Sequence, residues 1–267
     1  MIEINNHPII NDKDHSMPSV FTPENLLREA RRQKSIPEGP VPGICILDPD
    51  GDIVQNLIAS GQAKINPHWA CYHTQMYNFT YKGLEFGIVG NAVGASFAVL
   101  VAEEMFACGC NLLVSMTSAG QIVSKGTPPY FVLIEKALRD EGTSYHYQPP
   151  SKFSIINPQL LEALKNMLDE SQPPIFLGAT WTTDAPFRET ETAIDDRRSQ
   201  GILGVEMEAS ALYAFARAKE KPVVCFAHIT NQMGNVENDF EKGEAQGSRD
   251  AIEVIYKTAE ACQLFIN

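Results

Sequence analysis

Two glutamates separated by a single residue form the most chemically informative pair in the sequence. Glu206 and Glu208 lie within residues 204–211, where a short apolar run passes into a helical stretch of small residues. A carboxylate is rarely buried at such a junction unless it binds something. It can accept hydrogen bonds from two neighbouring sugar hydroxyls, and its charge can stabilise the cationic sugar that forms when a glycosidic bond breaks. The alternative is that both side chains only complement the dipole of the following helix.

An acidic loop follows the first apolar run. Asp48, Asp50 and Asp52 occupy alternate positions of residues 48–53, directly after the run at residues 44–47. Asp50 or Asp52 could act as a general base that activates a water molecule. An ordinary acidic turn explains the same residues.

Two more segments place small or hydroxyl-bearing residues directly after apolar runs. Gly90 and Asn91 precede a predicted helix, where glycine lets the backbone approach a ligand and the helix start offers free N–H groups. A plain turn is the alternative at that point. Residues 115–120 end another run with the hydroxyls of Ser115, Thr117 and Ser118. These five residues are predicted to line a pocket for phosphate or water.

Short apolar runs that alternate with helical stretches must hold these side chains in place. The runs cover residues 44–47, 86–89, 112–116, 175–177, 202–205 and 223–229, and the clearest helical stretches cover residues 95–106, 158–168, 208–219 and 248–264. Short runs rich in Ile, Val, Leu and Phe are typical of strands that are buried on both faces. Their alternation with helices predicts an α/β fold with a central mixed, largely parallel twisted sheet that helices cover on both faces.

This fold is expected to form a single domain over residues 41–267. Residues 1–40, with a helix at 23–33 behind the N-cap Thr22, are predicted to be an extension packed on that domain. In sheets of this kind, ligands collect at the carboxyl ends of the strands. The candidate residues named above follow apolar runs, so they are expected to meet there.

The overall charge and composition exclude several classes of partner. The 267 residues carry a formal net charge of −12, so no nucleic-acid partner is expected. No apolar run is long enough to span a membrane and the polar N-terminus does not resemble a secretion signal, so we expect a cytoplasmic protein without a membrane partner. The six cysteines lie mostly among apolar neighbours and are predicted to be buried thiols. His68, Cys71 and His73 lack a fourth ligand nearby, and neither a metal nor another cofactor is expected.

Residues 204–211 resemble the ribose-binding signature of the nucleoside phosphorylase and nucleosidase superfamily (purine and uridine phosphorylase family 1). The resemblance continues in order through residues 87–94, 115–121, 178–189 and 223–231, and it is nearest to the uridine phosphorylase branch. It implies an enzyme that cleaves the N-glycosidic bond of a ribonucleoside. It also implies that Met207 packs on the sugar and that Glu208 binds the sugar hydroxyls, with its carboxylate facing ligand rather than core. Glu206 would be a secondary sugar or base contact, and Ser118 takes the family's hydroxyl position beside ribose and phosphate.

The resemblance also implies a base pocket, built from Thr183, Phe187, Arg188, Asn231 and Gln232. Phe187 could stack on a base and Arg188 could donate to a carbonyl, although either could equally pack a loop. Family members that act on 6-aminopurines place an aspartic acid where Asn231 stands. An amide cannot protonate a base, so a pyrimidine or 6-oxopurine is favoured over adenine.

Family pockets are completed by a neighbouring subunit, which implies a homodimer or a higher homo-oligomer. Tyr72 and His73 lie near the position of the arginine that such a neighbour donates.

The departures from the family concern phosphate. Family phosphorylases hold inorganic phosphate with arginines, because a guanidinium pairs bidentately with an oxyanion. The corresponding positions here hold Ser115, Ile53 and, by approximate alignment, Tyr72. Phosphate is the family's default acceptor, but the missing arginines and the acidic loop favour water, with Asp50 or Asp52 as its base. The alternative function is a catalytically degenerate nucleoside-binding or regulatory protein of the same fold.

Overall fold

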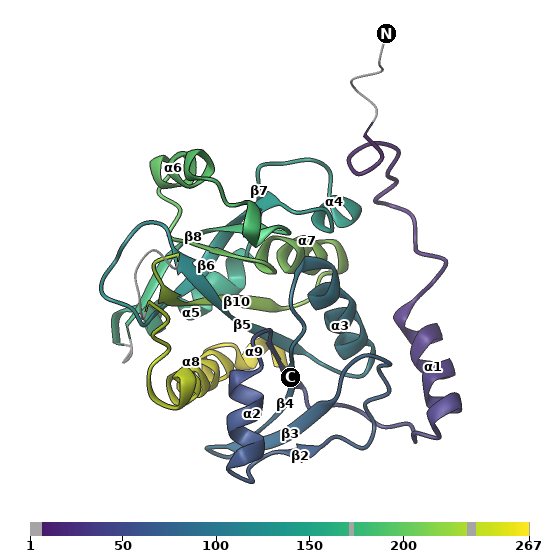
Figure 1. The fold of residues 1–267 in the computed structure, drawn as a ribbon. Coiled ribbons are helices and arrows are strands. Elements are labelled where there is room, and N and C mark those ends of the chain that lie inside the picture. The colour runs from purple at the N-terminus through teal and green to yellow at the C-terminus, as the bar shows by residue number, and fades with distance from the viewer. Residues whose placement is uncertain (1–6, 171–173, 234–238, 267) are drawn as a thin grey trace.

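The computed structural model describes residues 7–170, 174–233 and 239–266, and Figure 1 shows their arrangement. Within these residues, ten strands join in one sheet. The strands are β1 (Ile44–Asp48), β2 (Lys64–Ile65), β3 (Met76–Tyr81), β4 (Leu84–Gly90), β5 (Leu112–Gln121), β6 (Tyr130–Asp140), β7 (Phe153–Ile155), β8 (Ile175–Thr183), β9 (Gly204–Glu206) and β10 (Val223–Asn231).

The sheet is mixed, and most strand pairs at its centre are parallel. Strand β1 pairs in parallel with β4 and β5, β5 pairs in parallel with β10, and β8 pairs in parallel with β6 and β9. Antiparallel pairs join β5 to β9 and β6 to β10, so these strands close on one another. The predicted α/β class with a mixed sheet is confirmed. This closure brings the ends of β5, β9 and β10 to one place.

Helices flank the sheet in two groups. They are α1 (Pro23–Lys34), α2 (Asp52–Ala59), α3 (Ala95–Ala107), α4 (Ser144–Tyr147), α5 (Pro158–Glu170), α6 (Glu191–Ser199), α7 (Ala209–Lys219), α8 (Ser248–Ala261) and α9 (Gln263–Ile266), with short 3-10 turns η1 (Pro186–Arg188) and η2 (Glu244–Gly247). Helix α3 packs against α1 and α7, whereas α8 packs against α2 and α5 (Figure 1). No helix among the described residues is both long and apolar enough to cross a membrane.

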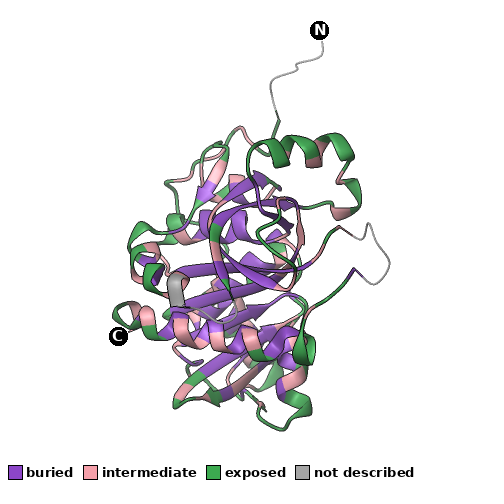
Figure 2. Ribbon diagram, turned by 90° about the vertical axis from the view of Figure 1, so that its left-hand side faces the viewer, coloured by how far each residue is buried: buried purple, intermediate pink, exposed green. Residues whose placement is uncertain are grey.

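The core lies between these layers. Figure 2 shows buried residues gathered in the strands at the centre of the molecule. All five residues of β1 are buried, because each face of that strand is covered. Strand β10 is buried from Val223 to Thr230 and only its last residue is partly exposed. The six cysteines are free thiols and all are buried. Polar residues at the strand ends therefore lie at the edge of the apolar core. Hydrogen bonds within the protein must replace the contacts with water that these residues lose there.

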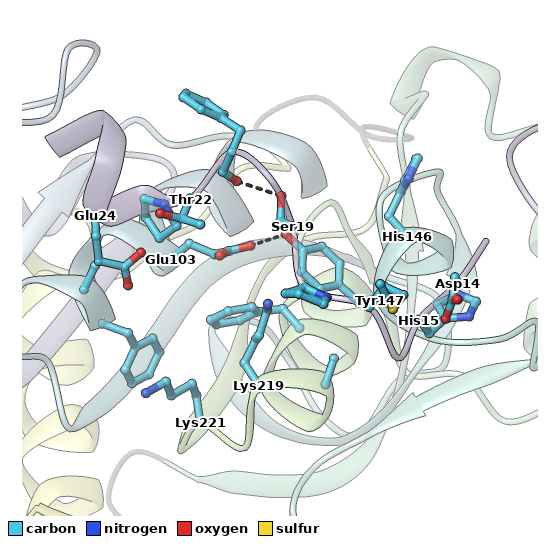
Figure 3. Close-up of a pocket in the computed structure, with 18 residues that line it drawn as sticks. Asp14, His15, Ser19, Thr22, Glu24, Glu103, His146, Tyr147, Lys219 and Lys221 are labelled. Atoms are coloured by element: carbon cyan, nitrogen blue, oxygen red, sulfur yellow. Dashed lines mark hydrogen bonds between the residues drawn. The ribbon is translucent and has the colours of Figure 1, made fainter. Parts of the chain in front are cut away.

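The N-terminal segment runs along the outside of α3 and α4. Thr22 caps α1 by accepting a hydrogen bond from the Asn25 amide at 3.3 Å, as its position in the sequence predicts. Helix α1 contributes Leu27 to the same core cluster as the sheet. A cavity of about 500 Å³ separates this segment from α3 and α7, and within it Tyr147 donates to Glu103 (Figure 3). This cavity contains neither the glutamate pair nor the acidic loop.

Candidate functional site

Eight of the sequence-predicted site residues meet in a second cavity, of about 380 Å³. It opens at the carboxyl ends of β5, β9 and β10 and is completed by the loops that follow β1, β4 and β8. The lining includes Asp50, Thr117, Ser118, Phe187, Glu206, Met207, Glu208 and Asn231 from the predicted set, together with Pro49, Val93, Ala119, Gly120, Pro186, Glu189, Val205, Met233 and Phe240. Elements far apart in the sequence therefore converge where ligands are expected in such sheets.

Glu208 stands at the start of α7 and links it to two other elements. Its Oε1 accepts a hydrogen bond from the Gly94 amide at 2.7 Å, and its Oε2 accepts one from the Thr117 hydroxyl at 2.9 Å. The carboxyl group lines the cavity, but the residue is only 1% exposed. Burial, followed by the charge of Glu206, raises the pKa of Glu208 to about 8. Protein donors already engage both oxygens, so the expectation that this carboxylate faces ligand stays a prediction.

Glu206 is the structural partner of the pair. Its Oε1 accepts from the hydroxyls of Thr180 at 3.0 Å and Thr182 at 2.5 Å, and its Oε2 accepts from the amides of Glu208 and Ala209, each at 2.7 Å. These four donors join β8 to the first turn of α7. Burial raises the pKa of Glu206, while the same donors favour its ionised form. Both oxygens are engaged by the protein, so a direct contact with a sugar or base stays a prediction.

Asp50 is fixed at the end of β5. Its Oδ2 accepts from the Ser118 amide at 3.1 Å and from the Ser118 hydroxyl in a short contact. Lys242 Nζ lies 3.7 Å from the same oxygen and contacts Asp52 Oδ2 more closely. Among the described residues no hydrogen bond engages the other oxygen, Asp50 Oδ1. Asp50 therefore lines the cavity with one carboxylate oxygen held by Ser118.

A smaller recess continues behind Asp50, and Asp52 belongs to it rather than to the main cavity. Asp48 is buried there, and its Oδ2 accepts from the Val54 amide at 2.9 Å. Burial raises the pKa of Asp48 to about 7. His228 lies in the same recess, stacked on Phe131 with ring centroids 4.4 Å apart, and burial lowers its pKa to about 4. Lys242 is thus the cation of this recess, where it lies beside Asp50, Asp52 and the neutral His228.

The opposite side of the cavity is suited to a flat ring. Phe187 is 99% exposed and Phe240 is 68% exposed, although both line the cavity. Asn231 is held by two hydrogen bonds, accepting from the Met233 amide at 2.9 Å and donating to the Thr230 hydroxyl at 3.2 Å. Glu189 also lines this side, and burial raises its pKa to about 7. An apolar surface with a few polar groups at its edge is the usual composition of a base pocket.

Three predicted base contacts lie outside this lining. Arg188 is exposed and points from the same turn as Phe187 without reaching the cavity. Thr183 is buried, and its hydroxyl accepts from the Ala185 amide at 3.2 Å, which closes the turn after β8. Gln232 is exposed, and its backbone amide donates to the Asp239 carboxylate. Roles for these side chains in base binding remain predictions.

Three predicted phosphate or water contacts also lie outside the lining. Ser115 is 1% exposed, on β5 between Leu47 and Cys225 of the neighbouring strands. Gly90 is required by packing, since a Cβ there would stand 2.5 Å from a methyl group of Val54. The backbone amide of Asn91 donates to the backbone carbonyl of Asp48 at 3.0 Å. The strand position that holds an arginine in the family is therefore filled by a side chain that does not reach the cavity.

Tyr72 and His73 lie on the outside of the domain. The Tyr72 hydroxyl donates to Gln33 of α1 at 2.9 Å, and Lys34 lies over its ring. The His73 ring contacts Phe97 of α3 edge-on. Neither residue lines the cavity within this chain. Their contribution to the site of a neighbouring subunit is still a prediction.

Sequence reasoning missed four polar residues of the site: Asp48 as a buried group, Glu189, His228 and Lys242. Glu189 and His228 lie within segments that resemble the family. The resemblance drew attention to other residues of those segments, namely Phe187, Arg188 and Asn231. Lys242 follows β10 by eleven residues, and its sequence surroundings suggest only a charged loop. A lysine without acidic neighbours in the sequence would have suggested a distant acidic partner. Lys242 has acidic neighbours on both sides, so the sequence gives no such indication.

The fold and the site together define an α/β protein with a cavity at its strand ends, beside a paired glutamate motif. The model of the phosphorylase superfamily matches residues 43–262. The chain belongs to that superfamily.

Known relatives are distant. A guanosine phosphorylase of Halorubrum lacusprofundi is 24% identical over 54% of this chain, a match that spans only 60% of the relative's length. A uridine phosphorylase of Thermococcus kodakarensis is 23% identical over 79% of this chain and 84% of its own.

Solved structures share the fold. A purine nucleoside phosphorylase of Toxoplasma gondii superposes with a TM-score of 0.69, at 12% identity over 86% of this chain and 96% of its own. The futalosine hydrolase of Helicobacter pylori gives a TM-score of 0.64, at 16% identity over 80% of this chain and 97% of its own. At these identities the similarity describes the fold.

Proposed function

We propose that this protein cleaves the N-glycosidic bond of a ribonucleoside with an oxo-substituted base, and that water is the acceptor. The observation that carries the proposal is the position of Asp50, which lines the cavity with its Oδ2 anchored by Ser118. The names of relatives, which include phosphorylases and a hydrolase, are consistent with either acceptor.

The sugar is assigned to the side of the cavity formed by Met207 and Glu208. Glu208 lies between the start of α3 and the end of β5, so ribose hydroxyls that bind there would share its oxygens with Gly94 and Thr117. The raised pKa of Glu208 keeps it largely protonated near neutral pH, but the positive charge that develops as the bond breaks favours its ionised form, which would stabilise that charge in turn. The base then lies toward Phe187, Glu189 and Asn231, where Asn231 can donate to a ring carbonyl.

Water is favoured because the cavity carries acid where the family carries base. Asp50 lines the cavity at the end of β5, and Ser115 is buried outside the lining. Phosphate approaching an ionised Asp50 would bring like charges together in a partly desolvated site. A neutral water molecule meets no such repulsion, and Asp50 Oδ1 can accept its proton as it attacks the sugar.

The test is product identity with a panel of nucleosides, including uridine, guanosine, inosine and adenosine. Ribose should appear at a rate that does not depend on inorganic phosphate, and Asp50→Asn should lower kcat by at least about a hundredfold, the usual contribution of a general base. Formation of ribose 1-phosphate that rises with phosphate concentration would refute the water acceptor. Nucleoside binding without any product, with or without phosphate, would instead favour a binding or regulatory protein, since a bound ligand needs only the Glu208 side of the cavity.

A further inference from the structure

One oxygen atom in the site collects an unusual set of donors. Asp50 Oδ2 accepts from the amide of Ser118 at 3.1 Å and from its hydroxyl, and the ammonium of Lys242 lies 3.7 Å away. The amide and hydroxyl belong to the end of β5, whereas Lys242 comes from the segment after β10. Three donors from two elements thus converge on a point occupied by negative charge.

Such a set of donors is what proteins use to bind oxyanions. A backbone amide, a hydroxyl and a cation arranged around one point form charge-assisted hydrogen bonds to phosphate or sulfate oxygens. Here the anion belongs to the chain itself. The Asp50 side chain is 32% exposed and that of Lys242 is 21% exposed, so the point borders the open cavity and is not sealed in the core.

The surrounding charges make this arrangement selective. Asp52 also contacts Lys242, and buried Asp48 lies in the same recess. While Asp50 remains in place, a second anion would have to displace it from Ser118 or accept repulsion from it. If the Asp50 carboxylate were removed, the two Ser118 donors and part of the Lys242 charge would become available.

We propose that Ser118 and Lys242 form an oxyanion-binding site that the chain's own Asp50 carboxylate occupies, so that Asp50 decides which acceptor enters. Lys242 is then the cation that stands in for the arginines absent from this chain. Its ligand class is a tetrahedral oxyanion of the size of phosphate or sulfate. The inference rests on the proposed function only in treating this point as the acceptor side of the cavity.

The experiment measures anion binding without nucleoside, so it does not depend on turnover. Wild type and Asp50→Ala are titrated with inorganic phosphate, and separately with sulfate, by calorimetry and by thermal unfolding in a buffer free of both ions. Sodium chloride at matched ionic strength controls for screening. Asp50→Ala should bind phosphate at least about tenfold more tightly than wild type, since the two Ser118 donors and part of the Lys242 charge become free. Asp50→Gly is expected to behave in the same way and replaces Asp50→Ala if that variant does not fold.

Two controls make the result specific. Asp52→Ala removes a carboxylate beside Lys242 but leaves the Ser118 donors occupied, so its phosphate affinity should stay near that of wild type. Adding Lys242→Met to Asp50→Ala should abolish the gained affinity. The proposal is overturned if folded Asp50→Ala gains no affinity, if Asp52→Ala gains as much, or if Lys242→Met leaves the gain intact. Failure of the nucleoside assay alone would refute the proposed reaction and leave this binding result unaffected.

Discussion

Glu206 and Glu208 are separated by one residue, yet their carboxylates bind different elements. Glu206 accepts from Thr180 and Thr182 of β8, whereas Glu208 accepts from Gly94 at the start of α3 and from Thr117 of β5. Residues two apart in a regular strand share a face, but β9 ends at Glu206 and the chain turns into α7, so the two carboxylates reach different elements although both residues line the cavity.

The first prediction follows from that division. Glu206→Ala should lower the free energy of unfolding by about 2–4 kcal/mol, because four donors lose a buried acceptor. Glu208→Gln should change it by less than about 1 kcal/mol, since an amide resembles the protonated carboxyl group that its raised pKa favours at neutral pH. Nucleoside affinity should nevertheless fall at least about tenfold in Glu208→Gln. Urea unfolding and calorimetry measure both quantities, and wild-type nucleoside affinity in Glu208→Gln would contradict the sugar assignment.

The second prediction concerns pH. Burial raises the pKa of Asp48 to about 7 and that of Glu208 to about 8, above the ordinary carboxyl range. The folded protein therefore holds these protons at a pH where the unfolded chain has released them, and stability falls as pH rises from 6 to 8. Each group contributes a slope of up to about 1.4 kcal/mol per pH unit.

Asp48→Asn and Glu208→Gln should each flatten this dependence. The comparison is the difference in unfolding free energy between pH 6 and pH 8 for wild type and each variant. The lowered pKa of His228, about 4, acts in the opposite direction from about pH 4 up to the ordinary histidine value of 6.5, so it overlaps the start of this window equally in wild type and both variants. Equal slopes in wild type and both variants would show that neither carboxyl group holds its proton in the folded state.

The third prediction addresses the base. Asn231→Asp should raise the ratio of activity on adenosine to that on uridine, because an acid beside the base can protonate a departing adenine. The aspartate can keep the hydrogen bond that Asn231 accepts from the Met233 amide, so the loop should hold its shape. Initial rates on both nucleosides give the ratio, and a ratio that is unchanged or lower would remove Asn231 from the base pocket.

The fourth prediction uses an exposed aromatic side chain. Phe187→Ala should raise KM for nucleosides several-fold, in line with about 0.5–1.5 kcal/mol for an aromatic contact, while the melting temperature stays the same. A side chain that is 99% exposed adds little to the core. Arg188→Ala is the matched control, because it comes from the same turn but lies outside the cavity lining. If Arg188→Ala raises KM and Phe187→Ala does not, the two roles are reversed.

Patterns of a few neighbouring residues could be read from the sequence alone. Short apolar runs such as 44–47 and 223–229 become the buried strands β1 and β10, and Thr22 caps α1 as expected, because burial and capping depend on local order. The chain's membership of its superfamily was equally accessible, since the paired glutamates and the segments around them keep their order. Strand β6 was missed, and its apolar start runs into charged residues such as Glu135 and Lys136.

Only the tertiary structure decided which partners each polar group has. The sequence places Asp50 in an acidic loop, but the closure of β5 against β10 brings Ser118 and Lys242 to its carboxylate. Glu206 and Glu208 look equivalent in sequence, and their different partners come from β8 and α3. Charge and hydrogen bonding act through space over a few ångströms, whereas these groups are separated by up to 192 positions along the chain, from Asp50 to Lys242.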